Sequence, residues 1–179
     1  MDLAEQLKAR FGVAEVADLV AVLPEVAQLP LAVGLDRFTA SERHFQQALA
    51  QMQALVKALC CADVMALFPV LGHEREVWLA PLEQAGLDVG RLSGGYQIGR
   101  DHKAWMSLPL AAGDLEKVLR VEAADGVRVQ PGGPNGLVLL DLDKGLMLRF
   151  WGADQVAIHA DADQAAAVQA QVTQFAATS

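Results

Sequence analysis

Cysteine is scarce in this sequence, and so is positive charge. The two cysteines, Cys60 and Cys61, are neighbours, and neighbouring residues do not easily adopt ordinary disulfide geometry. Their spacing also matches no zinc-binding pattern. The first residues lack the charged-then-apolar layout of a signal peptide. We therefore expect reduced thiols in a cytoplasmic protein, without a disulfide framework.

The deficit of positive charge excludes several classes of partner. Lysine and arginine number 14 against 22 aspartates and glutamates, so the net charge is −8. A nucleic-acid backbone would be repelled, and no basic cluster offsets this repulsion. An anionic membrane surface is disfavoured for the same reason. No apolar run approaches the ~20 residues that span a bilayer, so we expect no membrane insertion.

The usual signatures of catalysis are also missing. There is no nucleophile elbow, P-loop, paired-histidine zinc motif or dinucleotide fingerprint. The segment HERE at 73–76 is half of a zinc motif, and a solvated turn is the better interpretation. Asp141, Asp143 and Gly145 resemble part of a calcium loop, but their spacing favours a hairpin turn. Cys60 has no visible base beside it, so the sequence predicts no catalytic residue.

The composition is that of a folded protein. Hydrophobic residues make up 53% of the 179-residue chain and charged residues 20%, which is typical of a globular domain. A chain of this length can bury a hydrophobic core without disulfides or metal ions to stabilise it. We expect a single domain over residues 1–179, with a helical segment and connector at 1–37 and an α+β unit at 38–179.

Helical periodicity dominates the first half of the chain. Residues 2–23 predict two short helices separated at Gly12, and residues 24–37 predict a connector with two prolines. Residues 39–42 form a capping box that begins a long amphipathic helix ending near Cys60. Residues 64–70 predict a strand, and residues 76–79 predict its antiparallel partner. Residues 81–93 predict a loop or a short helical turn.

Strand patterns dominate the second half. Residues 104–110 and 118–123 are strand-like, although residues 114–119 also fit a helical turn. The strongest signal is a hairpin of residues 137–142 and 146–151 around a turn at 143–145. Residues 155–158 predict one more strand, and a helix begins near Asp163. The prediction is therefore an α+β fold with N-terminal helices, a long central helix, an antiparallel sheet and a C-terminal helix packed on it.

His44 is the candidate ligand, because of its place near the start of the long helix. The positive end of the helix dipole disfavours imidazolium there, and neutral imidazole is the form that binds metals. Its helical neighbours Phe45, Ala48 and Leu49 are apolar. An apolar wall with one imidazole suits haem, which needs an axial ligand and an apolar slot. The alternative is a boundary residue half in water, which residue type alone favours.

Several short segments, taken in order, resemble a known family. They are ERHF at 42–45, DVMAL at 63–67, HER at 73–75, GYQIGRDHKAW at 95–105, LVLLD at 137–141 and LMLRFWG at 146–152. The resemblance is to the HemS/ChuS/ChuX-type haem-utilisation proteins of bacteria, and covers most of the chain as one repeat unit. Members with two units hold haem within one chain, so a single unit is expected to form a homodimer.

The resemblance implies a cytoplasmic haem-binding protein for haem trafficking and iron acquisition, or, less favoured, one that degrades haem. Haem would be the cofactor, with His44 as the axial ligand of its iron. Charged side chains suit the haem propionates. The residues that the resemblance implies are His44 on the iron, Arg100, His102 and Arg149 facing the propionates or the distal side, and Phe45 and Met52 as walls of the slot.

An alternative function comes from a different class. A small acidic α+β domain without catalytic signatures also suits a protein-binding module, such as an inhibitor or immunity protein for a basic partner. Acidic surfaces speed such encounters through long-range attraction. Binding of haem separates this alternative from the first hypothesis.

Overall fold

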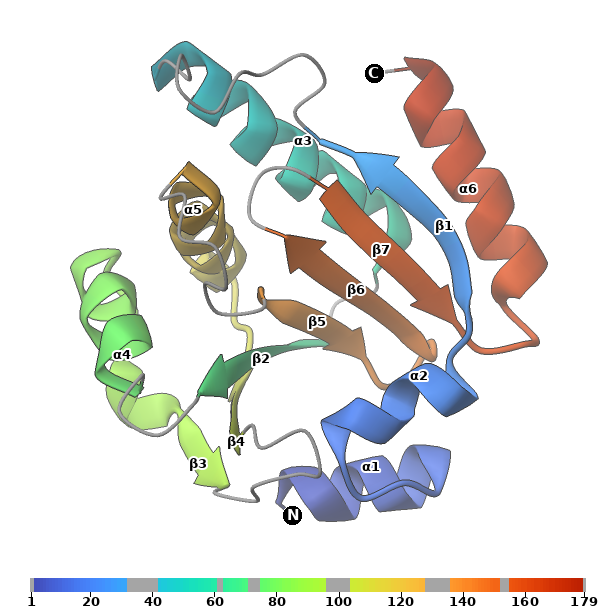
Figure 1. Ribbon diagram of the computed structural model, residues 1–179, viewed down its shortest axis with the longest axis horizontal. Coiled ribbons are helices and arrows are strands. Elements are labelled where there is room, and N and C mark those ends of the chain that lie inside the picture. Colours follow the sequence, from blue (N-terminus) through green and yellow to red (C-terminus); the bar gives the residue numbers. More distant parts are fainter. Residues whose placement is uncertain are drawn as a thin grey trace.

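A single antiparallel sheet forms the centre of the molecule (Figure 1). The computed structural model describes residues 2–31, 42–60, 63–70, 75–95, 104–127, 136–151 and 155–178. Its seven strands lie in the order β1-β7-β6-β5-β2-β4-β3, and each neighbouring pair is antiparallel. The strands are β1 (Glu25–Pro30), β2 (Val64–Val70), β3 (Ser93–Gly95), β4 (Ala104–Pro109), β5 (Val138–Asp141), β6 (Leu146–Trp151) and β7 (Gln155–Ala160).

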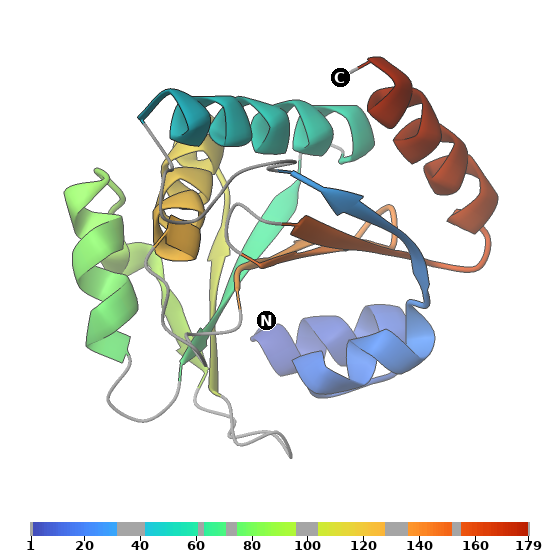
Figure 2. The same cartoon turned by 45° about the horizontal axis from the view of Figure 1, so that its top comes forward.

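Helices cover both faces of this sheet, as the turned view shows (Figure 2). The longer helices lie on one face, and the short N-terminal helices α1 and α2 lie on the other. The α+β class expected from the sequence is therefore confirmed. The helices are α1 (Leu3–Phe11), α2 (Leu19–Val22), α3 (Glu42–Leu59), α4 (Arg75–Gln84), α5 (Asp114–Val127) and α6 (Ala165–Thr178), with 3₁₀ turns η1 (Val16–Asp18) and η3 (Val89–Arg91).

The alternation of strand side chains divides the core into two parts. On β2, Ala66 and Phe68 join the large cluster beneath the longer helices. Met65 and Leu67 join a smaller cluster with α1 and α2. Successive side chains of a strand point to opposite faces, so one apolar strand supplies both cores. On the side of the smaller cluster, the sheet is covered by short N-terminal helices, so this face is less deeply covered than the other.

Local chemistry fixes both ends of α1. The Asp2 carboxylate accepts the Glu5 backbone N–H at 2.8 Å, and the Glu5 carboxylate accepts the Asp2 N–H at 3.1 Å. This reciprocal pair satisfies amides that the first turn leaves open. Gly12 ends the helix with a φ of 74°, which glycine adopts without a Cβ clash. The predicted separation of the two N-terminal helices at Gly12 is confirmed.

The sequence prediction is wrong at residues 24–37, where it expected only a connector. Residues Glu25–Pro30 form β1, which pairs with β7 at one edge of the sheet. Its side chains are exposed or half-buried without strict alternation, and a bulge interrupts the register between Glu25 and Ala27. Edge strands tolerate proline because one side needs no ladder bonds. The weak alternation and the proline together hide this strand from sequence analysis.

Two predicted strands are helices in the structure. Residues 76–79 lie in α4, which continues through Pro81, and both edges of β2 are already paired with β4 and β5. Residues 118–123 lie in α5, so the helical alternative was the right one there. Leu115, Val118, Leu119 and Glu122 follow helical spacing, and the last three are buried. Tertiary packing decided between two patterns that short apolar runs leave open.

Residues 81–84, expected in a loop or a short helical turn, are the end of α4, whereas the elements named below agree with the prediction. The long helix α3 ends at Leu59, and the strands at 64–70 and 104–110 are β2 and β4. The hairpin of β5 and β6 turns through Gly145 at a φ of 71°. β7 and α6 follow as expected. Residues 39–41 of the expected capping box lie outside the described residues.

Candidate functional site

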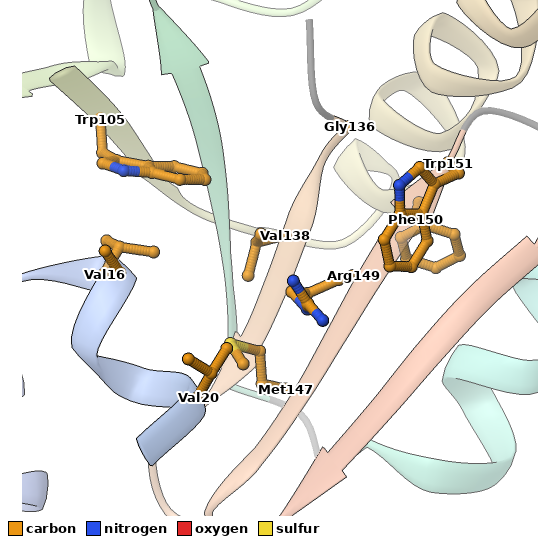
Figure 3. A pocket seen from close by; sticks show the side chains of 10 residues that line it. Val16, Val20, Trp105, Gly136, Val138, Met147, Arg149, Phe150 and Trp151 are labelled. Atoms are coloured by element: carbon orange, nitrogen blue, oxygen red, sulfur yellow. The ribbon is translucent and has the colours of Figure 1, made fainter. Parts of the chain in front are cut away.

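A hollow lies where the short N-terminal helices meet the sheet (Figure 3). Its volume is about 270 Å³. Its walls come from η1 and α2 on one side and from β4, β5 and β6 on the other. Most of them are apolar or aromatic, and one carries a positive charge. The lining residues are Val16, Ala17, Val20, Trp105, Gly136, Val138, Met147, Arg149, Phe150 and Trp151.

The alternation of β6 explains why a charged residue faces this hollow. Leu148 and Phe150 join the large core, whereas Met147 joins the small core on the other face. Arg149 and Trp151 share the parity of Met147, so they point to the same face. Arg149 lies between Val138 and Ala157 of the neighbouring strands. Arg149 and Val138 both line the hollow on this face.

Two neighbouring groups hold Arg149 in place. Its Nε–H donates to Nε2 of His159 at 3.0 Å. Its guanidinium carbon lies 5.2 Å from the centre of the Trp151 ring, within the range of a cation–π contact. Within the described part of the chain, no carboxylate pairs with it. Arg149 therefore brings a positive charge to the hollow without an internal counterion there.

His159, on β7, is buried, with 3% of its surface exposed. Its Nδ1 lies 2.8 Å from the carbonyl oxygen of Leu23. Because a carbonyl only accepts, Nδ1 must carry the hydrogen and Nε2 must be the acceptor. Burial lowers the pKa of His159 below its usual 6.5, and the Arg149 charge lowers it further, whereas the Leu23 bond and Glu25 oppose them. The neutral imidazole thus fits both of its partners.

Trp105 forms the wall of the hollow on β4. In Figure 3, Trp105 and Trp151 lie at opposite ends of the hollow, with Arg149 between them. The indole Nε1–H of Trp105 is buried and has no acceptor among the described residues. Buried donors in proteins are nearly always paired with protein, water or ligand. Among the described residues, this indole N–H is therefore a buried donor without an acceptor.

The structure brings one of the six predicted site residues to this hollow, namely Arg149. Phe45 and Met52 lie on α3 and pack in the large core on the opposite face of the sheet, where Met52 is 0% exposed. The backbone of His44 belongs to α3, but its side chain lies outside the described part. Arg100 and His102 also lie outside it. The sheet thus separates Arg149 from the two predicted slot walls.

The sequence analysis missed three residues of the site: Trp105, Trp151 and His159. A usable signal exists for Trp151, because Arg149 and Trp151 are alternate residues of a strand whose other positions are core-like. Trp105 and His159 carry no such local signal. Trp105 lies on β4, which β2 and β5 separate from β6, and His159 meets Arg149 through the pairing of β6 with the following strand β7.

A second hollow, of about 740 Å³, lies between the end of α3 and the start of α5. Lys57, Cys60 and Glu116 are among its lining residues. Lys57 and Glu116 are both exposed, and the hollow is open to solvent. It lacks the enclosed charge and aromatic walls of the first hollow, which is therefore the better candidate site.

Metal-binding clusters, membrane-spanning helices and known relatives are the remaining features that could identify the site. The described residues include no group of three or more His, Cys, Asp or Glu side chains placed to hold a metal ion. They also include no helix long and apolar enough to cross a membrane. No protein-family model matches the chain, and comparison with curated proteins and with solved structures gives no match. The chemistry of the hollow must be argued from its own residues.

Proposed function

We propose that this chain is a cytoplasmic haem-binding protein for intracellular haem trafficking and iron acquisition, and that the hollow beside Arg149 receives the haem. The observation that carries the proposal is a half-buried guanidinium, without a carboxylate partner among the described residues, in a hollow with indole walls. The ordered resemblance of the sequence to haem-utilisation proteins supports the same ligand.

The chemistry of haem suits the walls of the hollow. Haem is a planar, largely apolar ring with two carboxylates at one edge. Trp105 and Trp151 offer aromatic faces, which favour offset or edge-on contact with a flat ring. The terminal nitrogens of Arg149 suit a carboxylate, because guanidinium binds it through two parallel hydrogen bonds.

The size of the hollow determines how much of a haem enters it. Its volume of about 270 Å³ is slightly below that of most pockets for small molecules, which span roughly 300–1,000 Å³. We therefore place only the propionate edge inside. The rest of the ring would lie across the mouth, where Val20 is 46% exposed and Trp151 is 36% exposed. This partial enclosure suits a carrier that must release its cargo.

An axial ligand for the haem iron is the second part of the proposal. Among the described lining residues, Met147 carries a thioether, but it is 1% exposed and packs in the small core, so it does not reach an iron at the mouth of the hollow. His44 remains the ligand implied by the resemblance. Because α3 packs on the opposite face of the sheet, we propose that His44 of a second copy serves this hollow in the expected homodimer.

Titration with haemin tests the proposal. We expect a saturable change in the Soret band for the wild type. Arg149→Gln should weaken binding about tenfold, the scale of a lost charge-assisted hydrogen bond. Arg120→Gln is the matched control, because Arg120 forms only an exposed pair with Glu116 among the described residues, and should bind as the wild type does. No saturable change in the wild type would refute the proposal.

A carrier and a haem-degrading enzyme differ in what happens after binding. Bound haem exposed to a reductant and oxygen, with catalase present, should keep its Soret band if the chain is a carrier. Loss of the band under these conditions would identify ring opening instead. Haem would supply the redox chemistry in that case, and the protein would supply binding and access.

One observation favours a second candidate, an acidic protein-binding module. Val20, Val22 and Trp151 are exposed large apolar residues, and two of them flank the mouth of the hollow. Exposed apolar residues together with a net charge of −8 suit a basic protein partner. A pull-down from the native host that recovers no partner, together with haemin binding, would exclude this candidate.

A further inference from the structure

His159 is a buried polar group that the proposed binding of haem does not itself require. Both of its ring nitrogens are engaged, Nδ1 with the carbonyl of Leu23 and Nε2 with Arg149. The first bond reaches the end of α2, which carries Val20 in the wall of the hollow. The second reaches the charged group of the hollow. One side chain therefore connects two walls of the site.

We propose that His159 is a positioning residue whose unprotonated Nε2 holds the Nε–H of Arg149, so that the terminal nitrogens of the guanidinium face the hollow and bind a ligand carboxylate. This inference rests on the proposed function, because the carboxylate in question is a haem propionate. Neither His159 nor Leu23 lines the hollow, so His159 acts through Arg149 rather than by contact with the ligand.

The geometry of guanidinium explains why the Nε–H matters. Arginine has five N–H donors in a rigid plane. When Nε–H is bound to His159, the edge formed by the two terminal nitrogens is left for a bidentate contact. The Trp151 ring, 5.2 Å from the guanidinium carbon, restricts the plane from a second direction. A long flexible side chain held at two points loses less freedom when the ligand binds.

The charges around His159 favour this arrangement. Arg149 on β6 and Glu25 on β1 are the described charged groups that face it. Glu25 opposes His159 in the register of β1 and β7, and it is exposed. The buried imidazole is therefore neutral next to Arg149, which leaves Nε2 available as an acceptor.

Two substitutions test the roles of the two ring nitrogens of His159 separately. His159→Gln places an amide oxygen near the position of Nε2 and keeps an acceptor for Arg149. His159→Asn places an amide N–H near Nδ1 and keeps the donor to Leu23, but removes the acceptor. We would titrate each folded variant with metal-free protoporphyrin IX, which carries the propionates without iron, and follow its fluorescence.

The expected results differ between the two variants. His159→Gln should bind within about twofold of the wild type, and His159→Asn should bind about tenfold more weakly, as Arg149→Gln does. The double variant His159→Asn, Arg149→Gln should bind no more weakly than Arg149→Gln alone, because the two residues act as a unit. Equal affinity of His159→Asn and the wild type, or additive losses in the double variant, would overturn the inference.

A second measurement needs no porphyrin and no destabilised variant. The Nε–H of Arg149 should give a slowly exchanging NMR resonance in the wild type, assigned by its absence in Arg149→Lys, and His159 should show the Nδ1–H tautomer. Absence of these signals would reject the positioning role. If both signals are present but the wild type binds neither haemin nor protoporphyrin IX, the proposed function fails while the His159–Arg149 contact stands.

Discussion

At the scale of the residue, the site depends on one neutral histidine packed against one arginine. The Nδ1 of His159 and the carbonyl of Leu23 are 2.8 Å apart, and the Nε–H of Arg149 is bound to the other ring nitrogen. Protonation would place a second cation beside Arg149 and would remove its acceptor. The folded state therefore favours the neutral ring, as the lowered pKa of His159 expresses.

This lowered pKa predicts how stability depends on pH. The unfolded chain takes up a proton at His159 near the usual pKa of 6.5, but the folded chain does so only at lower pH. Between these two values the unfolded state binds more protons, so the free energy of unfolding falls as the pH decreases. The contribution is fully present above 6.5 and is lost as the pH falls toward the folded pKa.

Urea unfolding at a series of pH values from neutral to mildly acidic measures this effect. The free energy of unfolding of the wild type should decrease over that range more steeply than that of His159→Gln, which has no proton to take up there. Parallel pH profiles for the two proteins would contradict the burial of a neutral imidazole at this position.

At the scale of the element, the start of α5 is held by a carboxylate that reaches backward. Asp114 accepts the Ala111 backbone N–H at 2.8 Å and an Arg91 N–H at 3.0 Å. Arg91 also donates to the carbonyl of Pro109 at 3.0 Å, so the cluster joins η3, the end of β4 and the start of α5. Burial alone would raise the pKa of Asp114, but the bonds from Ala111 and Arg91 outweigh it and lower the pKa.

Removal of this carboxylate should destabilise the fold. We expect Asp114→Ala to lower the free energy of unfolding by about 1.5–3 kcal/mol, the usual contribution of hydrogen bonds to a charged group. Glu116→Ala is the matched control, because Glu116 makes an exposed pair with Arg120, and such pairs contribute only about 0.2–1 kcal/mol. Equal losses in the two variants, measured by chemical denaturation at neutral pH, would show that the Asp114 cluster does not stabilise the start of α5.

At the scale of the whole molecule, the sheet separates the two sets of residues assigned to haem. Arg149 faces the hollow beside η1 and α2, whereas α3, which carries His44, packs on the opposite face. A single copy therefore keeps the implied axial ligand away from the proposed propionate partner. The proposed homodimer resolves this separation, because one copy then supplies the hollow and the other supplies the histidine.

A mixing experiment tests this arrangement. Neither His44→Ala nor Arg149→Gln alone should give the wild-type Soret spectrum with haemin. After the two variants are mixed and allowed to exchange, mixed dimers should contain one hollow with both Arg149 and a partner histidine, and part of the wild-type spectrum should return. A wild type that binds haemin as a monomer in sedimentation, or a mixture without recovery, would rule out a histidine from a second copy.

The sequence determined the parts of this protein that local patterns encode. Helical spacing predicted α3 and α6, and the turn at Gly145 with its flanking apolar runs predicted the β5–β6 hairpin. The fold class followed from the order of these elements. Arg149 was predicted as a binding residue from the resemblance, and the structure does place it in a hollow.

The tertiary structure alone decided which distant segments meet. β1 forms a strand because β7 offers it a partner, and α5 is a helix because its buried face packs beneath the sheet. His159 and Leu23 are separated by 136 positions in the sequence, yet they share a hydrogen bond. Local periodicity carries no information on such pairings, since they depend on the summed burial and hydrogen bonding of the complete sheet.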